Sequence, residues 1–478
     1  MKHNKYLIFA ILISATLLMG SCKKYLDINT DPTTATAVDG KLLFGLAITY
    51  WNESRDAGDI HIPLTLGVQS IATGGNYGWG ADDVYNISKT SLGNTWTFYY
   101  QRIGNNLQLA IKAFQSAGNK NAVAQTQIVL AQTLYELSVL YGDIPFSEAF
   151  NTAFPYPHYD AQKDVFNGLL KMLDGAIANL DATNPLKITD YDVYYSGDIS
   201  KWIKLANSIK LKILMTMVDA DPTKAPAIGA LVSAPNTMIN SAAENWVWKY
   251  FPTKPNENPK YRLLETYAGG QNIFFFACKT VFDYMKPSDP RIPRYFDKKG
   301  ATYKAVNQNE EADATTSTIS AYLNRIDAPS YMYTYNEISF FEAEAYARGL
   351  GVTKDLAKAQ LLYKQALSAA FTLYGADATA SATYLATQLP DLSTLADPVY
   401  EIHLQQWIDL MDRAIEVFTQ WRRSGPQGSE VPALTIPLNA TTSPTLFRRY
   451  EYPNVERISN PNIPKPIPTF SDKVWFDL

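Results

Sequence analysis

Cysteine is scarce in this sequence, which contains only Cys22 and Cys278. Two cysteines cannot supply the several bridges that hold small disulfide-rich secreted domains together. The chain of 478 residues is long enough to bury a large hydrophobic core instead. We therefore expect a fold that depends on core packing, with Cys278 as a small buried thiol in the apolar run 273–281.

Clustered positive charge is also missing. The chain has 42 basic and 46 acidic residues, and its longest basic runs are pairs such as Arg422–Arg423 and Arg448–Arg449. Removing residues 1–21 deletes two lysines and no acids, so the formal net charge changes from −4 to −6. Binding to nucleic acid depends on clustered Lys and Arg side chains. We therefore expect no nucleic acid partner.

Catalytic motifs are absent as well. The sequence has no GxSxG nucleophile motif, no HExxH zinc motif, and only four histidines. Glycoside hydrolysis needs two carboxylates across the scissile bond. The adjacent Asp82 and Asp83 would point apart on a strand, and Glu342 and Glu344 do not face each other on a helix. The sequence therefore predicts a protein that is not an enzyme and holds no metal or cofactor. A surface glycoside hydrolase assembled from distant residues stays the alternative.

The first residues of the chain have the pattern of an export signal. After a short basic start, the apolar run 6–19 is too short to cross a membrane, which takes about 20 apolar residues. Small Gly20 and Ser21 then stand directly before Cys22, as in a bacterial lipoprotein box. We predict that residues 1–21 are a signal peptide and that lipid, palmitate among the acyl chains, is attached to Cys22. Two or more acyl chains are enough for stable anchoring. Ordinary secretion is the alternative.

Aromatic side chains are abundant. They make up 13% of the chain, with 31 Tyr and 9 Trp, whereas charged residues make up only 18%. Tyr and Trp combine an apolar ring face with a hydrogen-bonding edge, and a sugar ring has CH faces rimmed by hydroxyl groups. This composition favours a neutral polar ligand over an ionic one. A large helical core that uses many tyrosines would explain it equally well.

Helical periodicity covers most of the chain after residue 40. Within 336–374, small and aromatic residues fall at the positions that a tetratricopeptide helix pair requires. We predict one all-α dominated domain over 40–478, built from tetratricopeptide-like helix pairs and joined to the lipid anchor by a tether over 22–39. The other segments with apolar residues at helical spacing are 100–114, 123–141, 163–180, 199–213 and 399–422.

Two segments interrupt the helical pattern. Residues 67–92 are rich in glycine and aromatic residues, and residues 241–335 are rich in Pro, Asn and aromatic residues. We predict that the second segment is an irregular subregion of loops and short strands on the ligand-binding face. Aromatic residues in these segments would stack on a sugar, and nearby polar residues would bind its hydroxyl groups. A ring that folds back into the core is the alternative for each. The candidate ligand-binding residues are Asn76, Tyr77, Trp79, Asp82, Asp83, Trp96, Trp246 and Trp248.

Short motifs with a shared order lie along the whole chain. They are the lipoprotein box at Cys22, YGDIPFSEA at 141–149, GDISKW at 197–202, DPR at 289–291, FEAEA at 341–345, WRR at 421–423 and RYEYP at 449–453. In this order they resemble the SusD/RagB family of nutrient-binding outer-membrane lipoproteins. The resemblance is to the SusD-like, starch-binding-associated branch in particular.

This resemblance implies an α-helical fold in which four tetratricopeptide-like helix pairs support a looped ligand-binding face. It also implies capture of a glycan at the outer membrane, facing the cell exterior, and delivery to a TonB-dependent transporter of the SusC type. Capture of a peptide by the same architecture and a purely structural helical-repeat adaptor remain the alternatives. Lys23 and Lys24 stand where exported lipoproteins of such bacteria often have acidic residues, so the membrane leaflet stays open.

Overall fold

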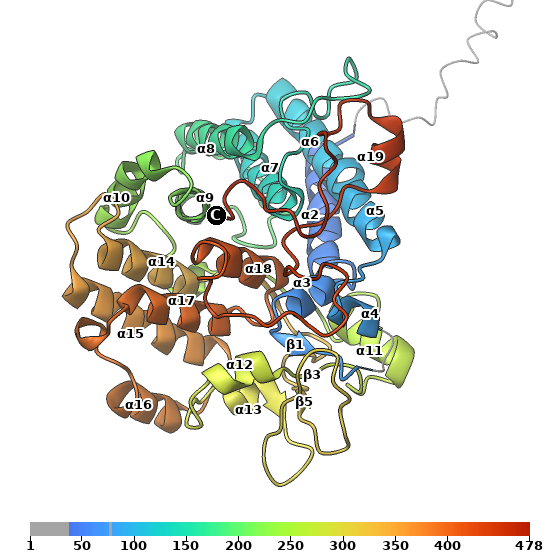
Figure 1. The fold of residues 1–478 in the computed structure, drawn as a ribbon. Coiled ribbons are helices and arrows are strands. Elements are labelled where there is room, and N and C mark those ends of the chain that lie inside the picture. Colours follow the sequence, from blue (N-terminus) through green and yellow to red (C-terminus); the bar gives the residue numbers. More distant parts are fainter. Residues whose placement is uncertain (1–37, 76–78) are drawn as a thin grey trace, which may run out of the picture. The chain divides into compact units, whose positions relative to one another are not determined.

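Helices dominate the computed structural model, which describes residues 38–75 and 79–478. Residues Gly40–Leu478 form one compact unit (Figure 1). The predicted signal peptide and Cys22 lie outside the described residues. None of the described helices is long and apolar enough to cross a membrane.

The first half of the unit is a run of helices connected by short turns. Consecutive helices pack against one another from α6 to α9. Asn119 caps α7 by accepting a hydrogen bond from the Ala122 amide, and Gly142 ends it with φ of +78°. The helices are α2 (Gly40–Asp56), α3 (His61–Gly67), α4 (Gly80–Asp83), α5 (Lys89–Thr97), a π-helix (Phe98–Gly104), α6 (Asn105–Ser116), α7 (Lys120–Tyr141), α8 (Gln162–Asn179), α9 (Ile199–Met217) and α10 (Ala225–Ser233).

The second half begins with short elements and ends with longer helices. The predicted tetratricopeptide-like pair over 336–374 is present as α14 packed against α15. The elements are α11 (Pro259–Ala268), α12 (Lys279–Tyr284), α13 (Ile292–Tyr295), α14 (Tyr335–Arg348), α15 (Leu356–Leu373), α16 (Ala378–Thr387), α17 (Pro398–Asp409), α18 (Ala414–Arg423) and α19 (Asn454–Ser459), with 3₁₀ turns at Pro222–Lys224, Ala242–Glu244 and Leu392–Thr394. The prediction of an all-α dominated fold with such helix pairs is confirmed.

The prediction of a single helix over 399–422 is wrong in one respect, because this segment forms two helices, α17 and α18. At Arg413 the backbone leaves the helical region, with φ of −105° and ψ of 86°. The Arg413 guanidinium donates to the Tyr331 carbonyl at 3.1 Å and to the Met332 carbonyl at 2.9 Å. The break therefore lets a charged side chain bind the backbone of a neighbouring strand, which apolar periodicity does not reveal.

Short strands occupy the irregular region over 241–335, as expected, and one further strand lies in the earlier segment 67–92. Four of them, β1 (Ile71–Ala72), β3 (Phe276–Ala277), β5 (Thr318–Ile319) and β4 (Phe296–Asp297), form an antiparallel sheet in the order β1-β3-β5-β4. A second sheet pairs β2 (Trp246–Trp248) with β6 (Ser330–Tyr333). Pairing of β1 with β3 brings the glycine-rich segment after residue 72 beside the segment before residue 276.

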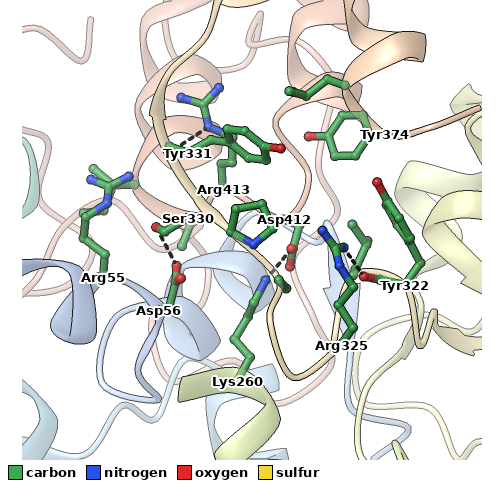
Figure 2. Close-up of a pocket in the computed structure, with 16 residues that line it drawn as sticks. Arg55, Asp56, Lys260, Tyr322, Arg325, Ser330, Tyr331, Tyr374, Asp412 and Arg413 are labelled. Carbon is green, nitrogen blue, oxygen red and sulfur yellow. Dashed lines mark hydrogen bonds and ion pairs between the residues drawn. The ribbon is translucent and has the colours of Figure 1, made fainter. Parts of the chain in front are cut away.

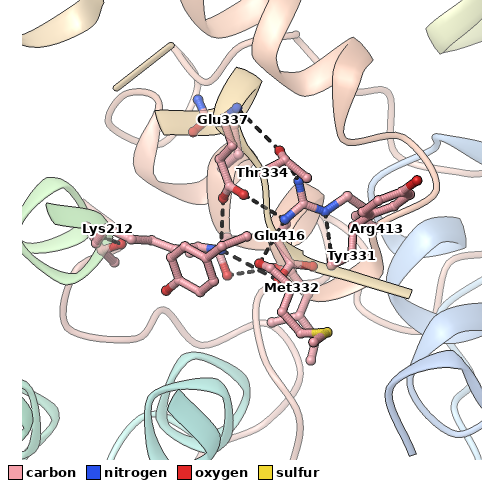
Figure 3. A network of polar contacts seen from close by, with 12 residues as sticks. Lys212, Tyr331, Met332, Thr334, Glu337, Arg413 and Glu416 are labelled. Carbon is pink, nitrogen blue, oxygen red and sulfur yellow. Dashed lines mark hydrogen bonds and ion pairs between the residues drawn. The ribbon is translucent and has the colours of Figure 1, made fainter. Parts of the chain in front are cut away.

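A buried ionic network ties the helices together (Figure 3). Glu416 of α18 accepts two hydrogen bonds from Arg55 of α2, at 2.9 and 3.0 Å, and lies 3.5 Å from the Lys212 ammonium of α9. Glu337 of α14 lies 2.9 Å from the same ammonium and 2.6 Å from the Arg413 guanidinium. Glu136 of α7 also pairs with Arg55, so three carboxylates face three cations and the network is electrically compensated inside the core.

Candidate functional site

Trp79 belongs to a cluster of rings at the surface. Its ring centroid lies 5.7 Å from that of Tyr267, 5.3 Å from that of Phe274 and 5.5 Å from that of Phe275. Tyr267 is 67% exposed, and the other three side chains are half-buried. We call these four residues the aromatic platform. Partly exposed rings of this kind can stack on the apolar face of a ligand while their edges stay in water.

The turn before β3 holds two of these rings in place. The Asn272 side-chain oxygen accepts hydrogen bonds from the Phe274 and Phe275 amides, at 3.2 and 3.0 Å. Its side-chain nitrogen donates to the carbonyls of Phe275 and Ile319, at 3.0 and 2.9 Å. This one side-chain amide therefore fixes the backbone from which both rings project.

Gly74 holds the start of the glycine-rich segment against a neighbouring loop. Its φ is +69°, and a Cβ there would lie 2.6 Å from the Cβ of Ala312, so only glycine fits. The Ala312 amide donates to the Gly74 carbonyl at 3.2 Å. In the sequence, the cluster of glycines indicated a special backbone conformation in this segment. The structure shows that Gly74 contacts Ala312.

The two adjacent aspartates have different environments. Asp83 is buried, and its carboxylate accepts hydrogen bonds from the Thr73 hydroxyl and, at 3.2 Å, from the Thr73 amide. Asp82 is only half-buried. Burial, followed by repulsion from Asp83 and Asp59, raises the pKa of Asp82 to about 7. Asp83 thus ties α4 to the end of β1, whereas Asp82 is reachable and can carry a proton near neutral pH.

Trp246 lies in the core, and for this residue the prediction is wrong; Trp96 is largely buried as well, although it lines a hollow beside the π-helix. Trp246 has no exposed surface, and its ring centroid lies 5.0 Å from that of Trp51 and 5.4 Å from that of Tyr194. Trp96 is 5% exposed and packs 5.0 Å from Tyr141. The Trp246 ring is enclosed by other rings and cannot stack on a ligand.

Trp248 lies apart from the platform, on β2. It is half-buried and contacts Tyr194 and Tyr250, with ring centroids 6.2 and 6.4 Å away. In the described part of the chain, no ring contact joins this group to Trp79. Asn76 and Tyr77 lie outside the described residues, so the structure places neither of them.

Sequence reasoning missed three members of the platform as site residues, namely Tyr267, Phe274 and Phe275. They belong to an aromatic-rich segment, but so do Phe276 and Trp246, which are buried. Tyr267 stands in the last turn of α11, which Gly269 ends in the left-handed conformation.

A second, charged pocket opens between α2, α11, α18 and the loop before β6 (Figure 2). Its Lys260 ammonium lies 2.5 Å from the Asp412 carboxylate, which also contacts the His61 ring at 2.9 Å. The Asp56 carboxylate accepts a hydrogen bond from the Ser330 hydroxyl at 3.2 Å. Lys260 and Asp412 therefore pair within the pocket, whereas Arg55 and Arg413 pair with Glu416 and Glu337 outside its lining. The pocket joins distant segments of the chain.

Comparison with known families decides the classification. The profile of the SusD-like family, described as starch-binding associating with outer membrane, matches residues 47–453. The chain belongs to this family. The match covers the helical pairs and the aromatic platform together. A comparison with curated proteins finds no match.

Solved structures share the SusD-like fold. A chitin-binding protein superposes with a TM-score of 0.76 and 22% identity, covering 92% of this chain and 100% of its own. A SusD/RagB family protein from Bacteroides thetaiotaomicron has a TM-score of 0.76 and 21% identity, with coverages of 92% and 99%. A chitin-binding SusD homologue from Flavobacterium johnsoniae has a TM-score of 0.72 and 17% identity, with coverages of 91% and 99%. At these identities the likeness establishes the fold of this SusD-like protein.

Proposed function

We propose that this SusD-like protein captures a neutral oligosaccharide on the aromatic platform at the outer membrane and passes it to a TonB-dependent transporter of the SusC type. The observation that carries the proposal is the close grouping of Trp79, Tyr267 and Phe274 with one strongly exposed ring. Family membership supports it, because the family is described as starch-binding and associated with the outer membrane. Two of the similar structures are named chitin-binding.

A polar side chain close to Trp79 along the chain fits the same ligand. Asp82 follows Trp79 by three residues and is half-buried, with its pKa raised to about 7 by burial and by Asp83 and Asp59. Near neutral pH its carboxyl group can therefore donate or accept a hydrogen bond. A sugar hydroxyl group both donates and accepts, so it can pair with either form.

Isothermal titration of the full chain in detergent with maltohexaose, chitohexaose and short peptides tests this proposal. We expect one of the two oligosaccharides to bind, and Tyr267→Ala to weaken that binding about fivefold, because an aromatic contact contributes about 1 kcal/mol. Tyr267 is 67% exposed, so the substitution should leave the melting curve unchanged. An assay for new reducing ends, run in parallel, should detect no product.

The matched control is Tyr400→Ala. Tyr400 is 38% exposed and lies on α17, among the helices of the second half (Figure 1). Its loss should leave sugar affinity unchanged. Equal affinity of wild type and Tyr267→Ala would reject the platform as the site. Binding of peptides but of neither oligosaccharide would replace the glycan with a peptide cargo, and steady release of reducing ends would identify an enzyme.

The anchor and the transporter are part of the same proposal. Cleavage before Cys22 and acylation of its thiol would place the domain at the end of a tether over residues 22–39. Metabolic labelling with a palmitate analogue should mark the wild type and leave Cys22→Ser unlabelled. Purification from outer membranes should recover a SusC-type transporter with the wild type. Unlabelled wild-type protein, or recovery without any transporter, would contradict these two parts.

A further inference from the structure

A second aromatic hollow lies on the π-helix between α5 and α6. Its volume is about 390 Å³, and Trp96, Tyr100, Phe150, Gln101, Asn105 and Glu456 line it. We call it the π-helix hollow. Its lining shares no residue with the aromatic platform, and it is completed by α19, which packs against α5. We propose that the π-helix hollow is a second binding site for a neutral sugar unit; this inference rests on the proposed glycan-capturing function.

The π-helix is what gathers the lining residues on one side. Trp96 and Asn105 are nine positions apart, which is about two and a half turns of an α-helix and would put them on opposite faces. In a π-helix the backbone hydrogen bonds join residues five positions apart instead of four, so each turn contains about one residue more than a turn of α-helix. The turn over Phe98–Gly104 therefore aligns Trp96, Gln101 and Asn105 toward the same hollow. π-helical turns are frequent at functional sites.

Phe150, in the wall of the hollow, is held in an uncommon conformation. Phe150 has φ of +60°, which is rare for a residue with a large side chain. Its ring lies against Gly104, where a Cβ would come within 2.3 Å of the Phe150 Cζ atom. The Tyr100 ring centroid lies 5.8 Å from that of Phe150 and 4.9 Å from that of Trp96. A continuous aromatic surface thus forms one side of the hollow.

Hydrogen-bonding groups complete the lining. Gln101 and Asn105 are exposed, and within the described part of the chain their side-chain amides make no hydrogen bond. Glu456 Oε2 accepts a hydrogen bond from the Tyr159 hydroxyl at 2.8 Å, while Oε1 accepts none from any described residue. Amides can donate to and accept from sugar hydroxyl groups, and a carboxylate oxygen accepts from them. The polar groups can therefore bind the hydroxyl groups at the edge of a sugar, while the aromatic rings beside them contact its CH face.

Charge narrows the ligand class. Glu456 is the charged side chain in the lining of the hollow. An acidic sugar would bring a second negative charge against its carboxylate, which is unfavourable in a partly buried setting. The hollow therefore suits an uncharged pyranose unit of an oligosaccharide rather than a uronic acid.

Calorimetric titration of the full chain in detergent with maltohexaose and chitohexaose tests the second site. We expect a stoichiometry near two for the oligosaccharide that binds, and near one for the platform variant Trp79→Ala/Tyr267→Ala. Adding Gln101→Ala and Asn105→Ala to that variant should weaken the remaining binding at least about tenfold, because two hydrogen bonds are lost. Gln115→Ala, an exposed amide of α6 outside the hollow, should leave it unchanged.

The possible outcomes separate the two proposals. One bound sugar in the wild type and none in the platform variant would overturn the second site and leave the proposed function standing. Residual binding that survives Gln101→Ala/Asn105→Ala would also overturn it. If the wild type binds neither oligosaccharide, both proposals fail. Should the double platform variant lose its melting transition, Tyr267→Ala alone takes its place, because that side chain is largely exposed.

Discussion

Replacing Glu416 with Gln should strongly destabilise this SusD-like protein. Its carboxylate is 1% exposed and is shared by Arg55 and Lys212. Gln keeps the shape but removes the negative charge, so one of the buried cations loses its compensation. Breaking a buried ion pair from one side costs about 3–5 kcal/mol. We expect the urea midpoint of unfolding to fall accordingly.

The pKa of Glu416 leads to a similar magnitude. Burial alone would raise this pKa, but attraction to Arg55, Lys212 and Arg413 outweighs it and lowers the pKa from 4.5 to about 2. A depressed carboxyl pKa contributes stability that is present above pH 4.5 and is lost as the pH falls toward 2. At about 1.4 kcal/mol per pKa unit, the contribution is about 3 kcal/mol. Wild type should therefore lose more stability than Glu416→Gln between pH 5 and pH 2.5.

Urea titrations at pH 7, 5 and 2.5 measure both effects. Asp283→Asn is the control, because Asp283 and Lys279 form an exposed pair whose loss should cost less than about 0.5 kcal/mol. A loss below about 1 kcal/mol for Glu416→Gln at pH 7 would refute the reasoning. So would an identical loss of stability in wild type and variant between pH 5 and pH 2.5.

Three further predictions concern single positions. Burial raises the pKa of Asp82 to about 7, and a carboxyl group with a raised pKa lowers the stability of the fold as the pH rises through that pKa. In urea titrations, Asp82→Asn should therefore be about 1–2 kcal/mol more stable than wild type at pH 8 and equally stable at pH 4. Equal midpoints at both pH values would contradict this. Gly229→Ala should lower the free energy of unfolding by about 1–3 kcal/mol or more in the same assay, because its Cβ would lie 2.1 Å from the Gly351 carbonyl oxygen. The control, Gly175→Ala on α8, meets no atom within 4 Å and should stabilise the protein slightly. In a Cys22→Ser background, Cys278 should react with a thiol reagent only after unfolding. Burial raises the pKa of this thiol to about 12, and the thiol donates a hydrogen bond to Gln308 Oε1 at 3.0 Å. Rapid labelling of the native chain would show instead that the thiol is reachable.

Local patterns predicted the parts of the fold that depend on neighbours in sequence. The spacing of apolar residues over 123–141 and 163–180 indicated α7 and α8, because a helix repeats every 3.6 residues whatever it packs against. The small and aromatic residues of 336–374 indicated the α14 and α15 pair for the same reason. The break at Arg413 escaped notice, since its cause is a contact with β6, about 80 positions away.

The candidate site depended on contacts that no local pattern contains. Trp79 and Trp246 both stand in irregular segments, yet one joins a surface platform and the other is enclosed by Trp51 and Tyr194. Composition showed that rings were plentiful without showing which ring faces were already covered. Asp82 and Asp83 differ in the same way, because only Asp83 reaches Thr73.

The sequence by itself determined the helical class, the scarcity of cysteine that makes the fold rely on packing, and the order of motifs typical of the SusD-like family. These features depend on residue type and spacing along the chain. Only the tertiary structure decided which aromatic rings are exposed, because the exposure of a ring depends on which distant segments of the chain pack against it. The pairing of β1 with β3 sets the platform in this way, and the π-helix turn brings Trp96, Gln101 and Asn105 to one hollow.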